Sequence, residues 1–316
     1  RRRGQEEEVT PPPRLAAMGA TPTRYMGGQA VMDGVMMRGV DVWAVAVRRS
    51  DGGIELRVED APHWSERWNR IPLARGVANL VESLSLGMRA LTWSSEVNTP
   101  EEERLSKGGT AVSLVVALVF FVGLFLVLPM LGARGATALL GLSPLAFHLL
   151  EGLCSLGLFL GYLTLIGRIP DIRRVFEYHG AEHKAIAAYE RGVPLTPASA
   201  QTFTTEHVRC GTNFLLTVFV VAILLYSLVG RPALPVLIAS RVVLVPVIAG
   251  IAYEVIRFAA GHMDKRWVRT LMVPGLTLQR LTTREPSAEQ LEVAIAALRA
   301  VFTAEQSAEV DARRAA

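Results

Sequence analysis

Residues 111–131 read AVSLVVALVFFVGLFLVLPML and contain no charged side chain. A helix of about 20 apolar residues crosses the hydrocarbon core of a bilayer, so a run of this length limits what the chain can fold into. Two further runs lie at 142–167 and 213–230, and the fourth is best framed as 240–259, with Arg241 at one mouth. The sequence therefore predicts an α-helical membrane protein with about four transmembrane helices.

The basic residues predict which way these helices face. Of the 33 Lys and Arg residues, 15 lie in residues 1–107, 6 in 168–212 and 9 after residue 253, whereas the two remaining connections hold 1 and 2. Cytoplasmic segments of membrane proteins carry the excess of Lys and Arg. We therefore expect a multi-pass protein of the inner (plasma) membrane whose termini and 168–212 loop face the cytoplasm.

The same composition limits the partners. The net charge is +4, but the basic residues are not interleaved with aromatic side chains as on a nucleic-acid surface, so no nucleic acid is expected. The lipid bilayer is the expected partner, and a homo-oligomer or a membrane-protein partner remains open. The chain has two cysteines, Cys154 and Cys210, which do not make a disulfide framework.

Polar segments precede the membrane domain, which we place at 107–260. Residues 1–23 are rich in charge and proline and are expected to form a disordered arm. Residues 24–106 are expected to form a cytoplasmic β unit, because VWAVAVRR and IELRV flank the turn sequence SDGG, followed by an amphipathic helix over 72–93. Its apolar residues fit either the membrane interface or packing on the β unit.

Residues 261–316 are expected to be cytoplasmic. PGLTLQRLTTREP, at 274–286, has the composition of a turn-rich connector. Ser287 and Gln290 then form a capping box that predicts a helix over 288–303.

A polar motif, EYHGAEHK, lies in a helix predicted over 171–191. Positions i and i+4 share a helix face, so His179 and His183 point the same way, with Glu182 beside them. H-x-x-E-H is the inverted form of a zinc-protease helix motif, in which two imidazoles hold a metal ion and the carboxylate acts as general base. The alternative is a solvated helix face on which Glu182 pairs with a cation such as Lys184.

Further ligands are needed, because zinc takes three or four. His207 and Cys210 are spaced as H-x-x-C in HVRCGTN, and Glu254 lies at the cytoplasmic end of the fourth run. We count all three as candidate metal ligands. The alternatives are that Cys210 packs at a helix start and that Glu254 pairs with Arg257.

Four other polar residues stand out against apolar or glycine-rich surroundings. His148 and Glu151 are expected to be a hydrogen-bonded pair near the non-cytoplasmic end of the second run. Asp33 and Arg38 are the only charges of GGQAVMDGVMMRG, where shaping a turn is the simplest role.

Five motifs resemble, in order, those of the YqhQ-like family of bacterial membrane proteins, a domain of unknown function. The motifs are YMGGQAVMDGVMMRG, YHGAEHKAIAAYE, HVRCGTNF, PVIAGIAYE and PGLTLQRLTTREP. The resemblance implies an integral membrane protein and a metal-dependent enzyme. It places a site at His179, Glu182, His183, His207 and Cys210.

These patterns support a metal-dependent hydrolase that faces the cytoplasm and uses a divalent metal, with zinc the first choice. His179 and His183 would be ligands with Glu254 or His207 as the third, and Glu182 would be the catalytic general base. The sequence does not choose a substrate.

Two alternatives remain. The first is a non-catalytic membrane scaffold, in which the two helix histidines, His207 and Cys210 form a closed four-ligand structural site. The second is a transporter whose oligomer lines a path with His148, Glu151 and Arg241.

Overall fold

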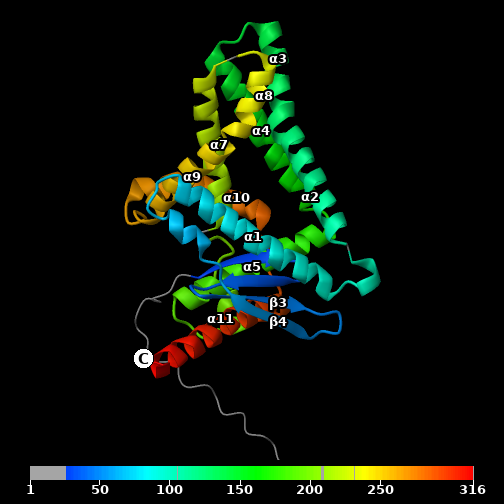
Figure 1. Ribbon diagram of the computed structural model, residues 1–316, viewed down its shortest axis with the longest axis vertical. Coiled ribbons are helices and arrows are strands. Elements are labelled where there is room, and N and C mark those ends of the chain that lie inside the picture. Colours follow the sequence, from blue (N-terminus) through cyan, green and yellow to red (C-terminus); the bar gives the residue numbers. More distant parts are fainter. Residues whose placement is uncertain (1–25, 105, 208–209, 231, 316) are drawn as a thin grey trace, which may run out of the picture.

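The computed structural model describes residues 26–104, 106–207, 210–230 and 232–315, so the arm predicted at 1–23 lies outside the described residues. The chain is mostly helical. A bundle of apolar helices stands on a part that contains a small β-sheet flanked by helices (Figure 1).

The sheet is antiparallel, with four strands in the order of the sequence: β1 (Gly27–Val31), β2 (Gly34–Arg38), β3 (Val42–Arg48) and β4 (Ile54–Asp60). The SDGG turn joins β3 to β4, with Gly52 at a φ of 88° that favours glycine. The predicted β unit and its hairpin are therefore confirmed.

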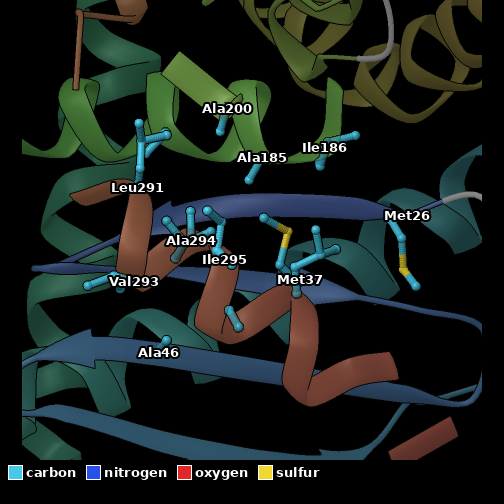
Figure 2. Packing of buried hydrophobic residues seen from close by; sticks show 14 of the residues in the cluster. Met26, Met37, Ala46, Ala185, Ile186, Ala200, Leu291, Val293, Ala294 and Ile295 are labelled. Atoms are coloured by element: carbon cyan, nitrogen blue, oxygen red, sulfur yellow. The ribbon is translucent and has the colours of Figure 1, made fainter. Parts of the chain in front are cut away.

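Helices cover both faces of this sheet, because successive side chains of β3 point to opposite faces and are apolar on both. Trp43, Val45 and Val47 face α1 (Ala74–Val97), which packs Leu86 and Ala90 against them. The other face carries small residues, including Ala44 and Ala46, that allow helices to approach closely (Figure 2). It is covered by α5 (Pro170–Glu190) and α11 (Ala288–Ala315), and α6 (Pro197–Gln201) packs against these two helices.

The C-terminal half of α1 packs on the sheet, as in the second of the two alternatives given above for this helix, rather than being left free for a membrane interface. In its N-terminal half Leu80, Val81 and Leu84 remain exposed. Short 3₁₀ helices, η1 (Trp64–Trp68) and η2 (Glu101–Glu103), flank α1 on either side.

The capping box predicted for the last helix is present. The Ser287 N–H donates to Gln290 Oε1 (2.8 Å), and the Gln290 N–H donates to Ser287 Oγ (3.2 Å). The predicted apolar face of α11, including Leu291 and Leu298, is fully buried against the sheet.

Three helices in the described residues are long and apolar enough to cross a membrane, or four if one bent pair counts as a single span. The first, over Gly108–Leu140, comprises α2 (Lys107–Val122), a π-helical turn η3 (Gly123–Val127) and α3 (Leu128–Leu140). The second and third are α4 (Pro144–Ile166) and α7 (Gly211–Val229). The bent pair, with an angle of 42°, is α8 (Leu234–Val243) and α9 (Val245–Ala260).

Two expectations need correction. The fourth apolar segment begins at Leu234 rather than near residue 240, so Arg241 is not at its mouth but is 1% exposed inside the bundle. The expected connector at 274–286 is mostly helical, because α10 (Arg266–Thr282) continues through Pro274. Its apolar face, including Val268 and Met272, is buried, and this packing outweighs the local effect of the proline.

Candidate metal centre

Helix α5 presents His179 and His183 on one side, with their ring centroids 4.5 Å apart. His179 Nδ1 lies 2.8 Å from the main-chain oxygen of Thr282, and His183 Nδ1 lies 2.6 Å from that of Thr205. A carbonyl oxygen only accepts, so each Nδ1 carries the hydrogen and donates it. In the neutral rings the Nε2 lone pairs are therefore left for a ligand, which is the arrangement found at metal-binding histidines.

Cys210 brings a thiol to these imidazoles. It is the N-cap residue of α7, and its Sγ accepts from the Thr212 N–H at 3.4 Å. The same Sγ lies 3.3 Å from His179 Nε2. Ligand atoms of His179, His183 and Cys210 all lie within 4.8 Å of one another. A tetrahedral zinc ion with bonds of about 2.0–2.3 Å needs separations of roughly 3.5 Å, so shifts below about 1 Å would complete the geometry.

Within this cluster of His179, His183 and Cys210, burial controls the protonation of His183 and Cys210. It lowers the pKa of His183 to about 3, with the neighbouring His179 charge adding to the effect, so this ring is neutral at physiological pH. It raises the pKa of the Cys210 thiol, although Thr212 donates to the sulfur. A metal ion that binds here must therefore displace the thiol proton.

Glu182 lies on the same helix, next to His183. It is 5% exposed, and no donor in the described part of the chain is bonded to its carboxyl group. Burial raises its pKa to about 8, with the Cys210 charge adding to the shift and His179 opposing it. Gly28 of β1 makes room for it, since a Cβ there would lie 2.7 Å from Glu182 Cγ.

His207 lies beside this group but outside it. Its ring centroid is 5.6 Å from that of His183, and its Nε2 is 3.3 Å from Glu190 Oε2. Gln279, which is fully buried, fixes the backbone at this point by accepting from the His207 N–H (2.8 Å) and donating to its C=O (2.9 Å).

Glu254 lies elsewhere and does not join the candidate ligands. Both of its carboxylate oxygens accept from Arg75 of α1, at 2.7 and 2.5 Å, and one also accepts from the Leu73 N–H. The expected pairing partner, Arg257, is therefore replaced by an arginine 179 positions away. Sequence spacing could not reveal this contact between α1 and α9.

The apolar bundle holds a separate polar cluster. The predicted pair is present, with His148 Nδ1 3.2 Å from Glu151 Oε2. Sequence reasoning missed that Arg241 donates to both oxygens of Glu151, at 2.6 and 2.5 Å, and that Tyr226 lies under its guanidinium group. The sequence feature that could have indicated this contact is Arg241 itself, a charged residue inside an apolar run.

Asp33 and Arg38 have structural contacts. Asp33 occupies the β1–β2 turn at a φ of 51° and accepts from Arg174 of α5 (2.5 Å). Arg38 donates to the buried Glu82 of α1 (2.6 Å). The residues that orient the histidines, Thr205 and Thr282, were also missed, since they act through main-chain oxygens that no side-chain pattern marks.

Fold and site together define the class: a helical protein with three or four bilayer-length apolar helices, a sheet-containing part and a His/His/Cys cluster where the two meet. The chain belongs to the family described as "Protein of unknown function (DUF1385)", whose model matches residues 71–304. It is 36% identical to "Uncharacterized protein YqhQ" of Bacillus subtilis (strain 168) over 286 residues, which cover 85% of this chain and 89% of that protein. No solved structure matches the chain.

Proposed function

We propose that this protein is a metal-dependent hydrolase of the plasma membrane whose site faces the cytoplasm. The membrane assignment is supported by the length and composition of the apolar helices. The orientation follows from the excess of Lys and Arg in residues 1–107, 168–212 and after 253. Cys210 immediately precedes α7, so the site would lie at the cytoplasmic boundary of the bilayer.

One observation carries the catalytic part. Two imidazoles oriented through their Nδ1 atoms and one thiol converge, while a buried carboxyl group without a donor in the described chain lies beside them. Three protein ligands leave a fourth position for water, as in catalytic rather than structural zinc sites. A divalent metal ion, with zinc the best fit to this donor set, would supply a bound water of lowered pKa. Glu182 would then accept the proton of that water.

The first experiment measures metal content. Purified protein in detergent should carry about one metal ion per chain by elemental analysis, and His183→Ala should lose it. His262→Ala is the matched control, since His262 lies just beyond the end of α9 and its Nδ1 bonds to the Phe258 oxygen instead. A wild-type protein without stoichiometric metal would reject the proposal.

The second experiment separates catalysis from binding. Glu182→Gln should retain the metal and lose hydrolysis of peptide, ester and phosphoester probes by roughly a hundredfold or more, the usual contribution of a general base. Unchanged turnover in this variant would remove Glu182 from the catalytic role.

A structural metal site in a scaffold protein is the second candidate, favoured by the position of His207 next to His183. Rotation of that ring away from Glu190 would bring a fourth protein ligand and close the site. X-ray absorption spectroscopy distinguishes the two, because a closed site gives four protein ligands and a catalytic one gives three plus a light oxygen ligand. His207→Ala should then unfold a scaffold and leave the metal of a hydrolase in place.

A further inference from the structure

β1 forms one edge of the sheet, since β2 is its strand partner and the order of the strands is β1-β2-β3-β4. Val31 pairs with Gly34 across a two-residue turn, so these two residues exchange both main-chain hydrogen bonds. Bonded and non-bonded pairs alternate along an antiparallel ladder. The N–H and C=O groups of Gly28 and Ala30 therefore point away from β2.

These outward groups have no hydrogen-bond partner in the part of the chain that the structure describes. Gly28 and Ala30 are half-buried and Gly27 is exposed, so the edge is not sealed. An unpaired strand edge of this kind is a template for the main chain of another segment.

The same edge runs past the candidate metal centre. Gly28 lies directly against Glu182, as the 2.7 Å between its virtual Cβ and Glu182 Cγ shows. Ala30 packs into the hydrophobic cluster that includes Ala181 and Ala185 of α5. Helix α5 therefore lies over β1. The carboxyl group of Glu182 adjoins Gly28, a position of the strand where a side chain would clash with it.

We infer that β1 binds an extended segment of polypeptide as an added strand and that the substrate of the proposed hydrolase is therefore a peptide bond. This inference rests on the proposed function and names its substrate class. Peptide main chain offers alternating donors and acceptors at the spacing of Gly28 and Ala30, which lipid headgroups and phosphoesters do not. In the reaction, the hydroxyl of water joins the carbonyl carbon, the C–N bond breaks and the second hydrogen of water ends on the amine.

Binding can be tested without metal or turnover. The probe is a fluorescent pool of random-sequence decapeptides, compared with the same pool N-methylated at every second amide. The full-length, metal-free protein in detergent should bind the unmodified pool at least about tenfold more tightly, because N-methylation removes the donors of a strand. The unmodified pool should also slow amide hydrogen exchange at Gly28 and Ala30.

A matched pair of variants locates the site. Ala30→Pro removes one outward N–H from an edge strand without breaking a β1–β2 bond, and should weaken binding about tenfold. Ala30→Ser keeps the N–H and should bind within about twofold of the wild type. Thermal unfolding of both variants checks that the sheet is intact, and if Ala30→Pro fails to fold, the comparison of the two peptide pools on the wild-type protein still tests strand addition.

The two proposals fail separately. Equal binding of the two peptide pools, or unchanged exchange at Gly28 and Ala30, overturns strand addition whatever the metal content. Strand addition with no metal-dependent cleavage of the bound peptides rejects the hydrolase and retains β1 as a peptide-binding edge. Cleavage of esters or phosphoesters alone rejects the peptide substrate and retains the hydrolase.

Discussion

His179 of α5 donates its Nδ1 hydrogen to the main-chain oxygen of Thr282, the last residue of α10 and 103 positions further along the chain. This contact, with the one between His183 and Thr205, fixes which nitrogen of each ring is available. The tautomers are set by main-chain atoms of neighbouring elements, so the orientation of the rings depends on the fold around α5.

The raised pKa of Glu182 predicts a pH dependence of stability in the metal-free protein. With a pKa of about 8 in the folded state, Glu182 holds a proton that the unfolded chain releases near the ordinary pKa of a glutamate, 4.5. The folded state therefore binds more protons between these values, and the free energy of unfolding falls as pH rises from about 4.5 to 8, by a few kcal/mol at most. Glu182→Gln should remove this decline in chemical denaturation series. Glu289→Gln, at an exposed carboxyl group of α11, should not.

Gly28→Ala should disturb the carboxyl group without touching a candidate ligand. The new Cβ would lie 2.7–2.8 Å from three atoms of Glu182, so either the strand or the side chain must move. We expect a loss of about 1–3 kcal/mol in unfolding free energy, as for other overpacked sites, and retention of metal. Gly27→Ala is the control, because its Cβ meets nothing within 4 Å. Equal effects of the two substitutions would mean that Glu182 does not pack on β1.

Cys210→Ser should reduce metal affinity strongly, because a hydroxyl group does not replace a thiolate as a zinc ligand. Binding to the wild type should release a proton from this buried thiol, and this proton is measured by titration calorimetry in buffers of different ionisation enthalpy. Cys154→Ser, at the exposed cysteine of α4, should leave both quantities unchanged. If metal binding to Cys210→Ser still released a proton, that proton would come from a group other than the Cys210 thiol.

Glu254→Gln should leave the metal content at the wild-type level. Its carboxylate bonds to Arg75 and Leu73 rather than to the candidate centre, so the variant should weaken the contact between α1 and α9 alone. Elemental analysis and limited proteolysis of α1 measure the two effects independently. Loss of metal would return Glu254 to the ligand set.

The buried ion pair of the apolar bundle predicts a stability cost. Glu151→Ala leaves Arg241, 1% exposed, without its carboxylate and should cost about 3–5 kcal/mol in detergent unfolding. The double variant Glu151→Leu with Arg241→Met should recover most of that loss, because no unpaired charge remains. A double variant as unstable as the single one would show that the ion pair contributes to the unfolding free energy beyond the mutual neutralisation of its two charges.

The sequence predicted the elements whose signal is local. The apolar runs, the SDGG hairpin and the capping box at Ser287 each depend on residues close together in the chain, and each is present in the structure. The helical spacing of His179 and His183 likewise predicted that they share a face. The helix through Pro274 was missed because its stability comes from tertiary packing, which outweighs local composition.

The remaining parts of the site depend on long-range contacts. Which of Glu254, His207 and Cys210 approaches α5 is decided by how α7, α9 and α10 pack, and no spacing along the chain encodes that choice. The carbonyl groups that orient the rings are present at every residue, so only the fold identifies Thr205 and Thr282.

The contact between His179 and Thr282 also constrains how the protein is made. During synthesis, a nascent chain that ends before residue 282 already contains His179, His183 and Cys210 but lacks the carbonyl group that orients the first of them. The orientation of His179 by this carbonyl group can therefore be completed only after α10 has been synthesised and has left the ribosome. The final orientation of the His179 ring therefore comes late in the synthesis of the chain.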